Sequence, residues 1–377
     1  METLNLIFTD YTLQIVALGS ALLGIISGVL GSFAVIRKES LLGDAVSHAA
    51  LPGIALAFLI TGTKNTEILL LGALVAGLLA TFLIIGISKY SRIKFDSALA
   101  LILSVFFGGG LVLLTYIQKI PNANQAGLEN FIFGQASTIL LRDVKTIAFL
   151  GAILLLLVVA FWKEFKLVSF DVDYAESLGF DTKKITWLLF AMIVTSIIIG
   201  LQTVGVILMS AMLTAPAVAA RQWTDKLHVM VVLSAFFGAI SGIGGAIVSA
   251  VVSKLPTGPM IVIIISIIVI ISLVLAPNRG MLWRYGRDRK NQKLINEDQL
   301  LVNLYHLAMN HNNTNHGHDL VTISPNLSLS RRGKKKIQKR IEELRTKGLV
   351  CEDYFNTWFI TDEGIDYVEN YFKKEGA

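Results

Sequence analysis

The chain has 377 residues, of which 54% are hydrophobic and 16% are charged, and its mean hydropathy is +0.65. Because soluble domains carry about 25% charged residues, this composition excludes an ordinary soluble enzyme and indicates a chain that lies largely in lipid. Most of the formal net charge of +6 comes from residues after position 277, where the sequence has the composition of a soluble domain.

Nine apolar segments precede residue 278, and each can form a helix that crosses the hydrocarbon core, which takes about 20 residues. The predicted spans are Leu13–Ile36, Asp44–Ile60, Glu67–Ser88, Ser97–Ile117, Val144–Trp162, Ile185–Leu201, Val204–Ala220, Val229–Val252 and Pro259–Ala276. Residues 1–277 are therefore predicted to form an all-α polytopic membrane bundle. Eight spans remain an alternative, since the second span and the separation of two helices at Gln202–Gly205 are open.

With nine spans, five groups of basic residues fall on the same side of the membrane. They are Arg37/Lys38, Lys89/Arg92/Lys94, Lys163/Lys166/Lys183/Lys184, Arg221/Lys226 and Arg279/Arg284/Arg287. Because positively charged loops face the cytoplasm, we predict an outside N-terminus and a cytoplasmic C-terminal domain.

Polar side chains gather on one face of the second predicted span. Ser40, Asp44, Ser47 and His48 follow helical spacing. An ionisable side chain inside a membrane helix is costly and indicates a function, and a carboxylate with an imidazole suits Mn, Fe and Zn better than Ca or Mg. Asp44 and His48, with Ser47 as a further candidate, are therefore candidate ligands of such a metal.

A structural alternative is that Asp44 caps the helix while His48 only hydrogen-bonds a neighbour. Two ligands are also too few for a tight metal site. A symmetric dimer would solve this, because it brings two copies of each residue around its axis.

Glycines recur inside three of the apolar segments. They are Gly24, Gly28 and Gly31 in the first, Gly108, Gly109 and Gly110 in the fourth, and Gly238, Gly242, Gly244 and Gly245 in the eighth. Small residues let helix backbones approach closely in lipid, so we interpret these stripes as packing surfaces of a bundle.

Five segments carry a family likeness in a fixed order. They are residues 41–58 (LLGDAVSHAALPGIALAF), Asp96–Ala100 with Ser104–Gly110, Phe131–Gly134, Thr203–Ala220 and Leu255–Pro259. Together they resemble the permeases of the manganese/zinc/iron ABC importer family, over roughly Leu13–Pro277.

The resemblance implies a non-enzymatic subunit in the plasma membrane of a prokaryote. It implies a second permease copy, cytoplasmic ABC ATPases, an extracytoplasmic metal-binding protein, and no permanently bound cofactor. The cargo would be a divalent transition metal, with manganese favoured and zinc or iron as alternatives. The family's metal-contacting Asp and His correspond to Asp44 and His48.

The chain contains no G-x-x-x-x-G-K-[ST] phosphate loop, so ATP hydrolysis requires a partner. Phe170–Thr182, which we call the docking segment, reads as a short helix ended by Gly179. The resemblance identifies it as the coupling helix that fits into the ATPase, through Asp171, Tyr174, Ala175, Leu178 and Gly179. A plain connecting loop is the alternative.

Behind a basic linker at residues 278–297, residues 298–377 resemble a small α+β winged-helix domain of iron/manganese-dependent or MarR-like repressors. The predicted order is a helix at Glu297–Met309, a basic helix at Arg331–Gly348, two strands at Leu349–Cys351 and Trp358–Thr361, and a last helix at Thr361–Phe372. The only cysteine, Cys351, excludes an intramolecular disulfide.

The C-terminal domain offers two further candidate sites. Polyanion contacts are possible for the basic residues Arg331, Arg332, Lys334, Lys335 and Lys336, although a protein or regulatory interaction is favoured over lipid or nucleic acid. Metal sensing is a hypothesis for His306, His311, His316 and His318, with a polar loop as the simpler interpretation. A membrane-anchored, metal-responsive DNA-binding regulator is the rival function, but nine spans are excessive for an anchor.

Overall fold

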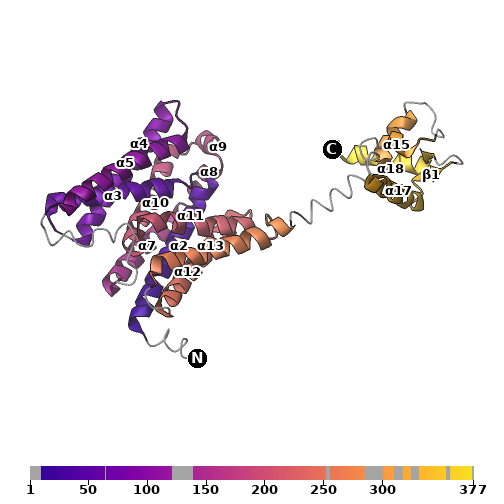
Figure 1. The fold of residues 1–377 in the computed structure, drawn as a ribbon. Coiled ribbons are helices and arrows are strands. Elements are labelled where there is room, and N and C mark those ends of the chain that lie inside the picture. Colours follow the sequence, from indigo (N-terminus) through magenta and orange to yellow (C-terminus); the bar gives the residue numbers. More distant parts are fainter. Residues whose placement is uncertain are drawn as a thin grey trace. The chain divides into compact units, whose positions relative to one another are not determined.

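The computed structural model describes residues 10–63, 65–120, 139–251, 255–283, 285, 300–309, 317–323, 331–353 and 357–375. The chain forms two compact units: Met1–Met281, which we call the membrane unit, and Leu282–Ala377, the C-terminal unit (Figure 1). Most of the predicted linker at residues 278–297 lies outside the described residues.

The membrane unit is built from helices. Those described are α2 (Tyr11–Ile36), α3 (Leu42–Thr61), α4 (Thr66–Tyr90), α5 (Phe95–Gln118), α7 (Leu141–Ala160), α8 (Trp162–Phe170), α9 (Val172–Ser177), α10 (Thr182–Val204), α11 (Val206–Trp223), α12 (Leu227–Val251) and α13 (Thr257–Leu275). Within the described residues, eight helices are long and apolar enough to cross a membrane, all of these except α8, α9 and α11. The prediction of a polytopic helical bundle is confirmed, and Phe131–Gly134 lies outside the described part of the chain.

The sequence left open whether there are eight or nine spans because α11 is less apolar than the eight helices that can cross a membrane. It has 18 residues and contains Pro216. The chain reverses direction between α10 and α11 at Gly205, whose φ of 87° suits glycine. The reversal is clear because an added Cβ on Gly200 would overlap Met209, whereas a straight helix would separate these residues by about 14 Å. The predicted separation at Gln202–Gly205 is therefore confirmed.

Several of the predicted basic loops lie together at one end of the membrane unit, which we call the basic end. Arg37, Lys89 and Lys183 line one cavity there. The last turns of α11 pack against the end of α2, and Asp225, just beyond α11, pairs with Arg279 beyond α13 at 2.6 Å. The ends of α2, α11 and α13 thus belong to the same end, as expected if α11 runs back across the bundle.

Helices α2 and α12 approach each other along a row of small residues (Figure 1). An added Cβ on Gly24 would overlap the backbone of Gly238, and the reverse also holds. One turn along, Ser234 Oγ donates a 2.7 Å hydrogen bond to the carbonyl of Gly28. The interpretation of the first and eighth spans as packing surfaces is confirmed.

The glycine triplet of α5 behaves differently. Gly110 packs against Pro52 of α3, whereas Gly108 and Gly109 have no atom of another residue near an added Cβ. Of these three glycines, only Gly110 packs against another helix of the membrane unit as predicted.

The C-terminal unit has its own core. It contains a helix at Leu300–Met309, α15 (Leu320–Ile323), α17 (Arg331–Thr346), β1 (Val350–Glu352), β2 (Trp358–Ile360) and α18 (Asp362–Glu375). The strands are antiparallel with Val350 opposite Ile360, and Gly348 ends α17 with a φ of 75°. The predicted order of helices and strands is confirmed, α15 was not predicted, and the winged-helix identity stays a prediction.

Replacing Gly238 by Val tests the contact between α2 and α12. The valine would push the two backbones apart at a cost of about 1–3 kcal/mol or more, so we expect a lower melting temperature and a loss of monodisperse protein in detergent. Gly86→Ala is the matched control, because a Cβ there meets nothing within 4 Å. Equal melting temperatures for both variants would contradict the contact.

Candidate metal-permeation site

The start of α3 places Asp44 and His48 in the bundle. After α2 the chain turns through Lys38, which has a φ of 61°, and α3 begins behind Leu41 without a side-chain cap. Asp44 lies in the first turn, where free backbone N–H groups favour a negative charge. It is not the N-cap, so the capping alternative is not supported. Ser40 lies in the turn before the helix.

Asp44 and His48 face each other one helical turn apart. His48 Nε2 lies 3.4 Å from Asp44 Oδ1, and their side chains are 15% and 41% exposed. The His48 ring packs edge-on against Phe107 of α5, with 4.6 Å between the ring centroids. The carboxylate of Asp44 also interacts with the hydroxyl of Ser210 in α11. One oxygen ligand and one nitrogen ligand are therefore presented together.

Along the length of the neighbouring helices, the pair lies near the middle of the bundle and not at either end. Val46, between the two residues, is close to Gly77, where an added Cβ would lie 3.4 Å from Val46 and 3.0 Å from Val194. Gly77 is near the centre of α4, and Phe107 is near the centre of α5. An ionisable pair at this depth is costly unless it has a role.

Ser47 is not brought to the pair. It is fully buried, and its hydroxyl donates to the carbonyls of Gly43 at 2.8 Å and Asp44 at 3.0 Å. In the described part of the chain no three His, Cys, Asp or Glu side chains gather into a group that could hold a metal. Ser210 was missed by the sequence analysis, although a polar residue within an apolar helix is a signal that could have identified it.

The docking segment forms the short helix α9 behind α8. Asp171 caps it, its Oδ1 accepting a 2.9 Å hydrogen bond from the Tyr174 backbone, and Gly179 ends it with a φ of 85°. Ala175 is fully buried, whereas Tyr174 and Leu178 are 54% and 53% exposed. The predicted helix and its glycine end are confirmed, and the segment presents apolar side chains outward.

Arg37 joins the α2–α3 turn to the segment before α9. Its Nε pairs with Glu39 Oε2 at 2.7 Å, and its Nη1 donates a 3.3 Å hydrogen bond to the Val168 carbonyl at the end of α8. The guanidinium also lies over the ring of Phe190 in α10, 5.3 Å from its centroid. The sequence analysis used Arg37 only for orientation and missed this connection.

The candidate residues of the C-terminal unit do not form one site among the described residues. His318 is buried and forms a backbone bridge with Trp358, His306 lies beside the ring of Tyr305, and His311 and His316 fall outside the described part. The basic residues 331, 332 and 334–336 belong to α17, but their side chains are not described.

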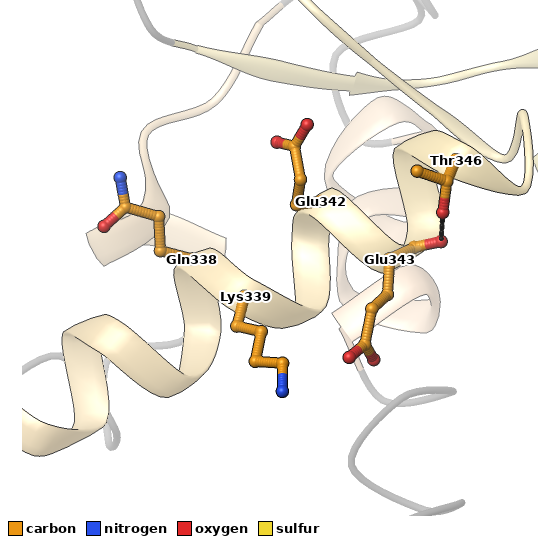
Figure 2. A pocket seen from close by; sticks show the side chains of 5 residues that line it. All are labelled: Gln338, Lys339, Glu342, Glu343 and Thr346. Atoms are coloured by element: carbon orange, nitrogen blue, oxygen red, sulfur yellow. Dashed lines mark hydrogen bonds between the residues drawn. The ribbon is translucent and has the colours of Figure 1, made fainter.

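The side chains that are described on α17 include both positive and negative charges. Figure 2 shows Gln338 and Glu342 on one side of the helix and Lys339 and Glu343 on the other, around an open hollow that Thr346 also lines. A polyanion-binding surface needs clustered cations, and this part of the helix does not supply them.

Comparison with known proteins places the membrane unit in a family. Residues 9–276 match the ABC 3 transport family. A zinc transport system membrane protein, TroC, of Treponema pallidum is 51% identical over 297 residues, which are 79% of this chain and all of the relative. A manganese transport system membrane protein, MntC, of Bacillus subtilis is 40% identical over 353 residues, which cover 94% of this chain and 80% of the relative.

A solved structure agrees with the fold. PsaBC from Streptococcus pneumoniae, in complex with Fab, is similar with a TM-score of 0.66 and 30% sequence identity. The match covers 76% of this chain and 99% of that one.

Arg37→Met tests the part-buried ion pair beside the docking segment. The substitution leaves the part-buried Glu39 carboxylate without its partner, which costs about 1–3 kcal/mol, so we expect a lower melting temperature in detergent. The double variant Arg37→Met/Glu39→Gln should recover part of the loss. Lys38→Met removes an exposed neighbouring charge and serves as the control; a drop of equal size there would contradict the pair.

Proposed function

The chain belongs to the ABC 3 transport family, and on this basis we propose that it is the membrane subunit of an importer for divalent transition-metal ions. Manganese is the first candidate cargo, zinc the second and iron the third. The observation that carries the proposal is the Asp44–His48 pair at mid-depth of the bundle. Carboxylate and imidazole together suit these metals.

Two ligands from one chain leave the metal incompletely coordinated. Asp44 is 41% exposed on this single chain although it lies at mid-depth, so its carboxylate faces a water-filled path or another protein. A second copy that meets this chain along that face would supply two more ligands. Four donors suffice for a transient site, and few donors allow the ion to leave again.

Energy would come from a partner ATPase, because the chain has no phosphate-binding loop. The docking segment supports this: α9 is fixed by buried Ala175 and presents Tyr174 and Leu178 outward. The basic end would then be cytoplasmic, and an extracytoplasmic metal-binding protein would deliver the ion at the opposite end.

A route for coupling follows from the contacts of Arg37. Movement of α9 by the ATPase would pull on α8, whose last carbonyls include the Arg37 acceptor Val168. Arg37 also holds Glu39 in the turn that leads into α3. The turn begins the helix that carries Asp44, so a shift at the docking segment would reposition the metal ligands.

Uptake by proteoliposomes tests the metal pair. With the partner ATPase and binding protein present, Asp44→Asn and His48→Gln should each lower uptake of radioactive manganese about tenfold or more, because the first removes the negative charge of the carboxylate and the second removes the imidazole nitrogen. Ser47→Ala should transport normally, since its hydroxyl bonds only the helix backbone in the described contacts. Competition between manganese and zinc in the same assay ranks the cargo. Undiminished uptake in both ligand variants would refute the assignment.

Co-purification tests the docking segment. The double variant Tyr174→Ala/Leu178→Ala removes two exposed apolar side chains from α9, so we expect at least tenfold less ATPase retained on the tagged permease, with an unchanged melting temperature. Leu140→Ala is the control, because Leu140 is 66% exposed and begins α7 at the opposite end. Normal retention of the ATPase by the double variant would rule out this surface.

A further inference from the structure

An open cavity of about 420 Å³ lies at the basic end of the membrane unit. Its walls come from the end of α4, the start of α10, helix α9 and the turn after α2. The lining includes Arg37, Phe82, Gly86, Lys89, Lys183 and Trp187. Neither Asp44 nor His48 belongs to this lining.

The polar end of the cavity is positively charged. Its described lining has three cationic side chains and one acidic side chain. Glu176, the acidic one, accepts a 2.7 Å hydrogen bond from Thr182 Oγ1, and Arg37 is already paired with Glu39. Lys89 lies over the Tyr90 ring, 5.6 Å from its centroid, and Lys183 is near Asp181, whose carboxylate pairs with Lys184 at 2.8 Å. These two lysines are the cations that we assign to a ligand, and their charge selects an anion.

The other end of the cavity is aromatic and lies deeper. Phe82 and Trp187 form a wall with ring centroids 5.9 Å apart, and Phe82 is 60% exposed. Phe82 precedes the end of α4 by eight residues, which is about 12 Å along the helix. The cavity thus runs from the ends of the spans, where the cations lie, to aromatic side chains further along the apolar spans. Trp and Tyr side chains are common where a span meets the membrane–water interface.

We propose that this cavity binds an anionic phospholipid. The phosphate of the headgroup would lie at Lys89 and Lys183, and the first part of an acyl chain would lie against Phe82 and Trp187. A basic pocket between spans is suited to an acidic headgroup, and the aromatic wall favours a ligand with a hydrophobic part over free phosphate. Gly86 is open to the cavity, because a Cβ there would meet nothing within 4 Å.

The position of the cavity gives the lipid a regulatory consequence, which rests on the proposed function of the docking segment. Val172 and Glu176 of α9 belong to the lining, so a bound headgroup contacts the helix on which the ATPase would dock. Binding of the lipid itself needs neither the ATPase nor a metal.

The test uses the purified full-length chain in detergent, titrated with phosphatidylglycerol or phosphatidylcholine and followed by native mass spectrometry. We expect preferential binding of phosphatidylglycerol. Because each lysine contributes about fivefold, Lys89→Gln/Lys183→Gln should weaken that binding at least tenfold. Gly86→Leu, which fills the cavity and keeps both charges, should weaken it as well. Lys184→Gln is the matched control, since Lys184 pairs with Asp181 at 2.8 Å and does not line the cavity.

Five results would overturn the proposal. They are equal binding of both lipids by the unchanged chain, normal phosphatidylglycerol binding by the double lysine variant, normal binding by Gly86→Leu, an equal loss in Lys184→Gln, and full displacement of the lipid by soluble glycerol phosphate. If the double lysine variant loses ATPase retention while its lipid binding stays normal, the cavity belongs to the ATPase instead. Melting temperatures equal to that of the unchanged chain exclude misfolding as the cause of any loss.

Discussion

A carboxylate at mid-depth of a membrane bundle is stable only where other groups replace its hydration, and Asp44 sets this constraint on the membrane unit. Two side chains meet it. His48 lies one turn further along α3, and Ser210 reaches the carboxylate from α11. The last contact requires α11 to run back beside α3, which the reversal at Gly205 provides. The site and the fold therefore depend on each other.

Local sequence signals predicted much of this structure. The apolar runs gave the spans, and Gly179 and Gly348 correctly marked helix ends because a positive φ suits glycine. The spacing of Asp44 and His48 predicted a shared face, which the 3.4 Å contact confirms. By contrast, the link from Arg37 to Val168 joins residues 131 positions apart. Such pairs leave no trace in periodicity or spacing, because they arise only when helices pack.

The Asp44–His48 pair alone does not determine which metal ion is the cargo. Relatives whose names state zinc and manganese align with this chain over most of its length, and both metals accept oxygen and nitrogen donors. The C-terminal unit has its own hydrophobic core around Leu304, Ile341 and Trp358.

The contact between α2 and α12 also has a mechanical consequence. At Gly24 and Gly238 the two backbones touch directly, with no side chain between them. Separating the helices would lose close van der Waals contact along the whole row, whereas sliding them along their axes requires no rotamer change. The Ser234 hydroxyl, bonded to the Gly28 carbonyl, acts against such a slide. The seam therefore resists separation of the two helices through backbone contact and resists sliding through this hydrogen bond.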